Sequence, residues 1–106
     1  MDCITSFQKN LYDVVKRVPK GYVTTYKEIG KSLGSSNYRY IGTLLGENQS
    51  SDVPCHRVVL SSRELGGYNL GSLEKAQRLE SEGVIMHKHS THPSKWKVDS
   101  SCVFIL

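Results

Sequence analysis

The chain has 106 residues, and 38% hydrophobic with 23% charged residues is the composition of a globular domain rather than of a disordered or membrane protein. This length provides for one hydrophobic core. We therefore expect one domain over residues 1–106, with its core at about 6–85 and a C-terminal extension at 86–106. Fourteen Lys and Arg against ten Asp and Glu give a net charge of +4, which permits a polyanionic partner without proving one. No stretch approaches the roughly 18 apolar residues that a membrane helix requires, so no membrane association is expected.

Cysteine usage bears on the compartment. Cys3, Cys55 and Cys102 are widely spaced and odd in number, and we expect no signal peptide before them. A secreted disulfide framework has an even number of cysteines, so we expect free thiols and an intracellular protein. Any of these thiols in an unusual setting is a candidate nucleophile.

The first half of the chain predicts three helices in order. Residues 6–18 place apolar side chains on one helical stripe, and a proline and a glycine follow them. After a short extended segment, Thr25 and Glu28 have the spacing of a capping box, which opens a second helix that Gly34 ends. Two serines after Gly34 are expected to cap a third helix from about residue 37 to residue 45.

Two short helices joined by a tight turn form a helix-turn-helix, which serves DNA binding or plain architecture. The apolar side of the third helix holds Tyr38, Ile41 and Leu45. Another face carries one long cation among small side chains: Arg39, Gly42, Thr43 and Gly46. Because glycine inside a helix costs about 1 kcal/mol relative to alanine, this face indicates the close approach of a partner, either DNA or another helix.

Beyond the polar loop that ends near residue 52, the pattern changes to short extended segments. Residues 53–60 and the glycines at 66–67 predict a hairpin or a bent loop. Ser72 is expected to cap a last helix that ends at Gly83. The apolar stripe of this helix consists of Leu73, Ala76 and Leu79.

The C-terminal segment has no clear periodicity. Trp96 is expected to hold a terminal strand against the body of the domain. His87, His89 and His92 could ligate a metal, but their spacing is not that of a structural zinc site. We therefore favour a solvated loop without a metal.

The residues around Cys55 carry the chemistry. Pro54 is rigid and presents the thiol from a turn, and His56 and Arg57 follow directly. A free thiol is only a few per cent ionised at neutral pH, so a nucleophilic cysteine needs a base or a positive charge nearby, and these two residues are the candidates. Because adjacent side chains often point apart, a water relay or a shared turn is expected in place of a direct contact. Glu82 is a candidate to fix the tautomer of His56. The alternative for an arbitrary Cys-His pair is a buried, inert cysteine beside a surface histidine.

The hexapeptide Pro-Cys-His-Arg-Val-Val at residues 54–59 resembles the active-site signature of the O6-alkylguanine-DNA alkyltransferases. The resemblance extends from residue 7 to residue 83, because the segments at 21–26, 39–48 and 82–83 occur in the family's order. It implies a mainly α fold with a small β element, a winged helix-turn-helix-like DNA-binding domain. It also implies DNA repair without a cofactor or metal, by direct and irreversible transfer of the alkyl group from O6-alkylguanine to Cys55, with O4-alkylthymine as a further substrate.

The resemblance assigns roles to individual residues. Cys55 is the acceptor, His56 acts through a water as its base, and Glu82 orients His56. Asn48 holds the turn behind the thiol, and Tyr26 donates a proton toward the guanine ring as it leaves. The resemblance further places three residues around the base: Val58, Tyr68 and Asn69.

The same resemblance defines the contact with DNA. The target atom is inaccessible within a duplex, so the nucleotide must be flipped out, and Arg39 would fill the vacated space. The helix that bears Arg39 is expected in the minor groove, where recognition is nearly independent of sequence. Further DNA contacts are expected from Tyr38, Gly42, Thr43 and Arg57. The implied partner is therefore double-stranded DNA with an alkylated guanine, bound by a monomer in the nucleus of a eukaryote or otherwise in the cytoplasm.

The sequence departs from the family pattern at several points. We expect this chain to lack the family's usual N-terminal domain of ribonuclease-H-like fold and any zinc site in it. The pocket segment at 68–71 is Tyr-Asn-Leu-Gly in place of Tyr-Ser-Gly-Gly, which bears on pocket volume, and Gly46 replaces a second arginine.

Two other functions are open on the sequence. The short length matches the alkyltransferase-like proteins, which bind alkylated DNA without repairing it and flag it for excision, and which typically have Trp at the acceptor position. Cys55 favours true transfer over this alternative. A cysteine hydrolase is disfavoured, because no oxyanion arrangement is evident.

Overall fold

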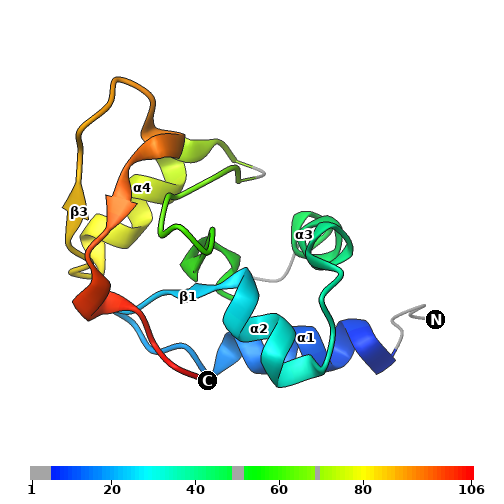
Figure 1. Ribbon diagram of the computed structural model, residues 1–106. Coiled ribbons are helices and arrows are strands. Elements are labelled where there is room, and N and C mark those ends of the chain that lie inside the picture. The colour runs from blue at the N-terminus through cyan, green and yellow to red at the C-terminus, as the bar shows by residue number, and fades with distance from the viewer. Residues whose placement is uncertain (1–5, 49–51, 69) are drawn as a thin grey trace.

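The computed structural model describes residues 6–48, 52–68 and 70–106, which form a mainly helical domain with small sheets (Figure 1). The helices are α1 (Ser6–Lys16), α2 (Tyr26–Leu33), α3 (Tyr38–Gly46) and α4 (Ser72–Ser81), with short 3₁₀ helices at Cys55–Arg57, Pro93–Lys95 and Ser100–Cys102. The strands are β1 (Thr24–Thr25), β2 (Val58–Val59), β3 (Met86–His87) and β4 (Lys97–Val98). Of the helices described, none combines the length and the apolar character that crossing a bilayer demands.

Two hydrophobic clusters build the interior. The first joins α1, α2 and α3 through fully buried residues such as Leu11, Ile29 and Ile41, and the second joins α4 to the C-terminal segment through Leu79 and Val98. Side chains alternate along a strand, so the two neighbouring valines of β2 point to opposite sides. Val58 packs in the first cluster and Val59 in the second. Strand β2 is therefore the junction between the clusters, and it follows the Cys55–Arg57 turn directly.

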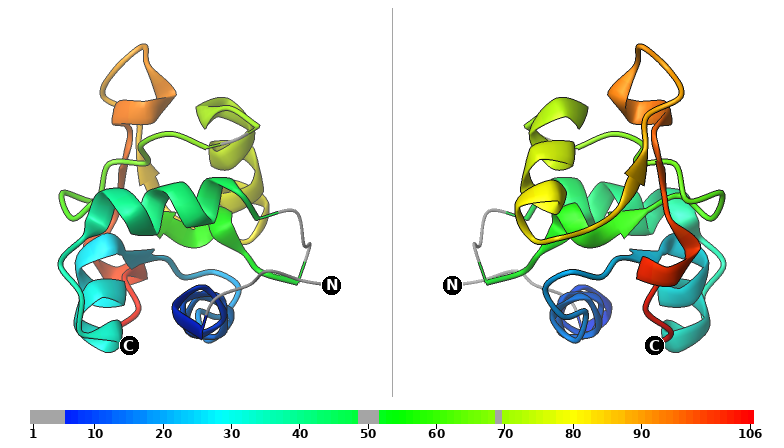
Figure 2. Two further views of the ribbon diagram at one scale, coloured as in Figure 1. Left: turned by 90° about the vertical axis from the view of Figure 1, so that its right-hand side faces the viewer. Right: turned by 90° about the vertical axis from the view of Figure 1, so that its left-hand side faces the viewer.

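The helix-turn-helix is formed as the sequence predicts. Thr25 caps α2 by accepting a 3.2 Å hydrogen bond from the backbone N–H of Glu28, and Gly34 ends the helix at φ +69°. Helix α3 crosses α1 at a large angle, since Figure 1 shows α1 from the side and α3 end-on whereas Figure 2 shows the reverse. The cap of α3 is Asn37, whose Oδ1 accepts from the N–H of Tyr40, and not the serines before it.

The apolar side of α3 differs from the predicted one by one residue. Ile41 and Leu45 are buried as expected, but the third buried residue is Leu44. Tyr38 is 41% exposed, because it lies in the first turn of the helix beyond the edge of the core.

The segment after the Cys55–Arg57 turn is a bent loop and not a hairpin. Strand β2 pairs in parallel with the distant β1, with Thr24 opposite Val58. The chain then turns back tightly, and the N–H of Leu60 donates to the carbonyl of Glu64 at 3.0 Å. The pairing of β1 with β2 brings the start of α2 beside the cysteine turn.

The N-cap of helix α4 lies one residue before the predicted cap, Ser72. Its N-cap is Gly71 at φ +96°, and Ser72 instead donates its side-chain O–H to the carbonyl of Gly66 at 2.9 Å. Leu73 is 53% exposed, whereas Ala76 and Leu79 are fully buried, so the apolar stripe starts a turn later than expected. The helix ends before Gly83, which has φ +93°.

The C-terminal segment returns to the body of the domain. Strand β4 pairs antiparallel with β3, and Val98 and Cys102 are buried in the second cluster. Trp96 packs against that cluster and donates its indole N–H to the carbonyl of Ser90, in agreement with its predicted role. His87 lies 2.9 Å from a carboxylate oxygen of Asp99, which places it in a polar pair at the surface.

Candidate active site

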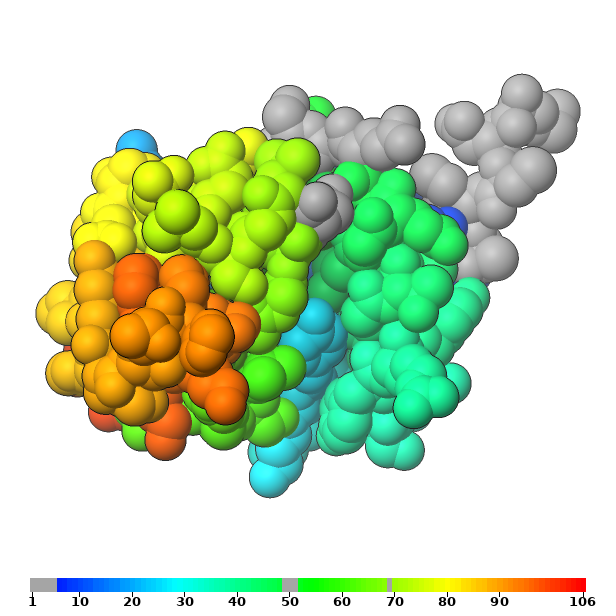
Figure 3. Space-filling model, turned by 90° about the horizontal axis from the view of Figure 1, so that it is seen from above, coloured from blue at the N-terminus to red at the C-terminus, as the bar shows by residue number. Residues whose placement is uncertain are grey.

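A cavity of about 270 Å³ opens where α3, the cysteine turn and the start of α4 meet. Figure 3 shows α3 facing the segment that leads into α4 across a groove, with the start of α2 at its floor. Six residues that matter for chemistry line the cavity, each from a different element or loop: Tyr26, Gly42, Cys55, Val58, Tyr68 and Lys75. All of these except Lys75 were site candidates from the sequence. They are spread over residues 26–68 of the chain, and the fold brings them together at the cavity.

Cys55 begins the 3₁₀ turn and is half-buried at the wall of the cavity. The side-chain amide of Asn48 donates to the Cys55 sulfur at 2.9 Å and to the Val53 carbonyl at 3.1 Å. Asn48 thus lies behind the turn, where the resemblance places it. Cys102 is buried in the second cluster, away from this cavity, while Cys3 and the pocket candidate Asn69 lie outside the described residues.

The electrostatic surroundings of the thiol act in opposite directions. Burial raises the pKa of Cys55, while the hydrogen bond from Asn48 and the positive charge of Lys75 lower it, and the net shift is upward. The thiol is therefore protonated at neutral pH, and a base is needed to remove its proton.

Lys75 is a site residue that the sequence reasoning missed. Its side chain is 2% exposed, and its ammonium donates to the carbonyls of Leu65 and Gly67. Burial lowers its pKa to about 8, although the neighbouring Cys55 opposes this shift. The available signal was its position, because Lys75 stands four residues before Leu79 on the buried stripe of α4.

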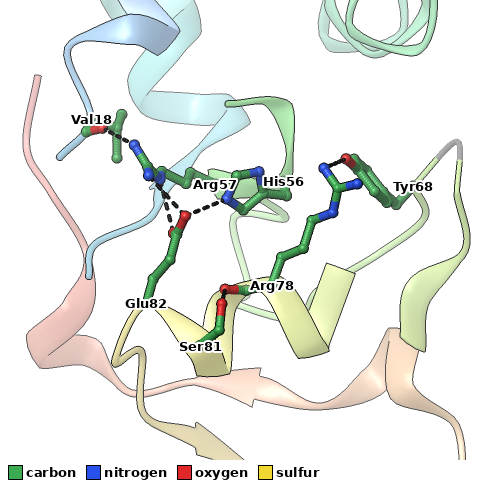
Figure 4. Close-up of polar contacts among 7 residues, drawn as sticks. All are labelled: Val18, His56, Arg57, Tyr68, Arg78, Ser81 and Glu82. Carbon is green, nitrogen blue, oxygen red and sulfur yellow. Dashed lines mark hydrogen bonds and ion pairs between the residues drawn. The ribbon is translucent and has the colours of Figure 1, made fainter. Parts of the chain in front are cut away.

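The base candidate His56 is oriented from a distant helix end. Its Nε2 lies 2.9 Å from Oε2 of Glu82, the residue that follows α4 (Figure 4). A carboxylate only accepts, so Nε2 carries the proton and Nδ1 of the neutral ring remains an acceptor. Burial lowers the pKa of His56, although Glu82 opposes the shift, so the ring is neutral at physiological pH.

Glu82 also binds the third residue of the turn. Arg57 donates to both carboxylate oxygens, at 2.9 and 2.8 Å, and to the carbonyl of Val18 at 2.9 Å (Figure 4). Burial raises the pKa of Glu82, but the bonds from Arg57 and His56 outweigh this and lower it overall. The carboxylate is consequently charged and held in one orientation.

The placement of Arg57 corrects its predicted role as a DNA contact. Its side chain is only 16% exposed, and its guanidinium is occupied by Glu82 and Val18. The bidentate geometry of a guanidinium matches a carboxylate, which explains why the side chain turns inward. Arg57 supports the orienting carboxylate and does not face outward.

The other predicted DNA contacts lie along the exposed side of α3. Tyr38, Arg39 and Thr43 are exposed, and Thr43 donates its hydroxyl to the carbonyl of Arg39. A second hollow of about 330 Å³ lies between α3 and the 60–61 turn, with Tyr38 and Arg39 in its wall. It shares Tyr26 and Gly42 with the cysteine cavity, so Tyr26 stands between the two hollows.

The two glycines of α3 are not explained by close helix packing. Among the described residues, a Cβ atom at Gly42 would meet only the Tyr26 side chain, at 3.7 Å, and one at Gly46 would meet nothing within 4 Å. Both residues line the cysteine cavity. The structure thus disfavours another helix of this domain as the partner that these glycines admit. The space is left for an occupant of the cavity or for a partner molecule such as DNA.

The fold and the site define a helix-turn-helix domain in which a partly buried Glu-His pair adjoins a cysteine in a cavity wall. Residues 6–84 match the family model for the DNA-binding domain of 6-O-methylguanine DNA methyltransferase, and the chain belongs to this family. The resemblance inferred from the sequence and the expected fold class are thereby confirmed.

Named relatives agree with this assignment. A methylated-DNA–protein-cysteine methyltransferase of Candida glabrata is 44% identical over 82 residues, which are 76% of this chain and 40% of that protein. The enzyme of the same name from Methanothermobacter thermautotrophicus is 38% identical over 80 residues, or 76% of this chain and 46% of that protein. The chain thus spans less than half the length of these curated relatives.

Solved structures of two kinds resemble the fold. Atl1 of S. pombe, in complex with damaged DNA containing O6-carboxymethylguanine, is 29% identical with a TM-score of 0.80, over 92% of this chain and 94% of that chain. The Mycobacterium tuberculosis protein OGT in complex with DNA is 34% identical with a TM-score of 0.70, over 74% of this chain and 50% of that chain. The O6-methylguanine-DNA methyltransferase of Pyrococcus kodakaraensis is 40% identical with a TM-score of 0.69, over 76% of this chain and 48% of that chain.

Proposed function

We propose that this domain binds double-stranded DNA, accepts a flipped O6-alkylguanine in the cysteine cavity, and transfers the alkyl group irreversibly to Cys55. The observation that carries the proposal is a thiol in the wall of a cavity, followed directly by a histidine whose tautomer a partly buried carboxylate fixes. Such a pair supplies the base that a thiol of raised pKa requires.

The chemical step balances with the groups present. The thiol proton passes through a water to Nδ1 of His56, and the Cys55 sulfur attacks the alkyl carbon. The carbon–sulfur bond forms as the bond from that carbon to O6 of guanine breaks, and guanine leaves with the electron pair. Tyr26 donates its phenol proton to the leaving guanine and regains one from solvent, into which His56 releases the thiol proton. Burial raises the pKa of the Tyr26 phenol, so the phenol is protonated before the step. One alkyl group consumes one protein molecule.

The exposed face of α3 would bring the lesion to the cavity. Arg39 is exposed in the wall of the second hollow, and Tyr26 separates this hollow from the cysteine cavity. The Arg39 side chain can therefore enter the base stack of the DNA next to the lesion. A cation that fills the space of the flipped nucleotide offsets part of the cost of flipping, which is a few kcal/mol. Surface lysines and arginines would supply salt-dependent affinity for the phosphates.

A non-enzymatic lesion-binding role is the second candidate. The observation in its favour is the structural likeness to Atl1, solved with damaged DNA, whose TM-score of 0.80 exceeds the 0.70 of OGT. Cys55 and its histidine pair favour transfer over this role, because a binding protein has no need of an oriented base.

The intact mass of the protein after incubation with an O6-methylguanine duplex separates the two candidates. We expect wild type to gain one methyl group, located on Cys55 by peptide mapping, and to gain nothing from an undamaged duplex. Lesion binding with an unchanged mass would support the second candidate. A methyl group on Cys3 or Cys102 would contradict the assignment of the acceptor.

A further inference from the structure

One face of α4 binds the segment that forms the cavity rim. Three polar side chains spaced three residues apart on the helix bond to three consecutive residues of that segment. Ser72 donates to the Gly66 carbonyl at 2.9 Å and Lys75 to the Gly67 carbonyl at 3.2 Å. One turn further along, Arg78 Nη1 donates to the hydroxyl of Tyr68 at 3.0 Å. The first two bonds hold backbone, and the third holds a side chain that lines the cavity.

We propose that Arg78 is a positioning residue that sets the orientation of Tyr68 at the cavity and so contributes to recognition of the lesion. The guanidinium also lies over the Tyr68 ring, with Cζ 5.7 Å from the ring centroid. Figure 4 shows the arginine extending from α4 to the tyrosine hydroxyl. This role rests on the proposed function, because Tyr68 matters only if the cavity receives a base.

The glycine-rich backbone around Tyr68 does not fix the orientation of its ring, which therefore depends on the contact with Arg78. Gly66 has φ +71° and Gly71 has φ +96°, and Gly67 precedes the tyrosine directly. Glycine restricts the backbone least of all residues, so the position of the half-buried ring depends on its side-chain partners. Glu74, one turn earlier on α4, lies 3.8 Å from Arg78 and restricts the arginine in turn.

The bond also determines which way the tyrosine donates. A guanidinium only donates, so the Tyr68 oxygen accepts from Arg78 and its own proton points elsewhere. The hydroxyl proton is then available to an acceptor on the bound base or to a water in the cavity. Tyr68→Phe removes this hydroxyl, whereas Arg78→Ala frees it to rotate, so the two variants are expected to affect the same step.

A phosphate contact is the competing role for Arg78, because its side chain is 43% exposed. The two roles differ in what they change. A phosphate contact strengthens binding to damaged and undamaged duplexes alike and adds about one to the salt slope. A positioning role changes only the preference for the lesion.

The test is equilibrium binding of wild type, Arg78→Ala, Tyr68→Phe and the double variant to an O6-methylguanine duplex and to the same duplex undamaged, at several salt concentrations. We expect each single variant to lose about two- to tenfold in lesion preference, the equivalent of one hydrogen bond, and the double variant to lose no more. Affinity for the undamaged duplex and its salt slope stay unchanged. Arg17→Ala, which removes an exposed charge at the end of α1, is the matched control. Equal weakening on both duplexes with a reduced salt slope, or an unchanged lesion preference, would overturn the proposal.

A readout that needs no DNA separates this proposal from the proposed function. With 3-fluorotyrosine incorporated, Tyr68→Phe identifies the ¹⁹F resonance of Tyr68. We expect this resonance to shift and broaden in Arg78→Ala and to stay unchanged in Arg17→Ala. A resonance that ignores Arg78→Ala refutes the positioning role. If Arg78→Ala perturbs the resonance but the wild-type protein neither prefers nor repairs the lesion, the contact between Arg78 and Tyr68 is supported. The proposed function, on which the positioning role rests, is then refuted.

Discussion

The imidazole of His56 and the carboxylate of Glu82 lie 2.9 Å apart, although the two residues are 26 positions apart in the chain. His56 belongs to the cysteine turn and Glu82 follows the last residue of α4. The contact therefore couples the geometry of the base candidate to the docking of α4 on the second cluster. Arg57 binds the same carboxylate, so the turn and the helix end are joined by three polar groups.

Replacing the shared carboxylate tests this junction. Glu82→Gln should reduce the free energy of unfolding by about 1–3 kcal/mol, because the partly buried Arg57 loses charge-assisted bonds. Methyl transfer should also slow, since the histidine tautomer is no longer fixed. Urea unfolding and single-turnover transfer measure the two effects. Glu80→Gln on the exposed face of α4 is the matched control, and an equal loss in that variant would contradict the special role of Glu82.

The pH dependence of transfer reports on His56. Its pKa is lowered from 6.5, mainly by burial, so the ring keeps its ability to accept a proton below that pH. We expect the transfer rate to hold as pH falls to 6.5 and to decrease only at lower pH, as the imidazole becomes charged. Rates at saturating DNA measured between pH 5 and 8 would show this. If the transfer rate begins to fall above pH 6.5, the base is not a histidine of lowered pKa, and His56 is excluded from that role.

The buried Lys75 makes a prediction about stability. Its pKa falls from 10.5 in an unfolded chain to about 8 in the fold, so the unfolded state binds more protons between these values. Wild type should therefore gain stability relative to Lys75→Met as pH rises from about 8 to about 10.5, by up to about 3 kcal/mol. Urea unfolding of both proteins across this window is the measurement. A difference between them that stays constant would mean that the lysine is not desolvated.

The two described cysteines should behave differently. Cys55→Ala is expected to bind the lesion duplex and to show no transfer, because only the acceptor is removed. Cys102→Ala should transfer normally and lose some stability, since that side chain is 94% buried in the second cluster and shares no wall with the cavity. Gel-shift binding together with intact mass separates these outcomes. Transfer that persists in Cys55→Ala would refute the proposed acceptor.

Arg39 is expected to act on flipping and not on folding. Because its side chain is exposed on α3, Arg39→Ala should leave thermal stability within about 0.5 kcal/mol of wild type and weaken binding to the lesion duplex. Fluorescence of a 2-aminopurine placed at the lesion position reports flipping directly and should fall. Arg17→Ala controls for loss of charge, and an equal fall in that variant would assign the effect to general electrostatics.

Local patterns accounted for the helix-turn-helix. The capping box of Thr25 and Glu28, the stop at Gly34 and the apolar stripe of α1 depend on hydrogen bonds and spacings within a few residues, so the sequence predicted them. Predictions that failed, such as a cap at Ser72 and an inward Leu73, lie where the cavity rim competes for those side chains. Long-range partners decide such positions.

By itself, the sequence determined a basic composition, a helix-turn-helix and a cysteine followed directly by a histidine and an arginine, and its ordered motifs indicated the family. Only the tertiary structure decided that β2 pairs with β1, that Arg57 turns inward to Glu82, and that Lys75 is buried beside the thiol. The physical reason is that burial and charge pairing depend on which distant segments meet. A guanidinium or an ammonium looks the same in a sequence, whether its partner is water, a phosphate or a carboxylate across the core.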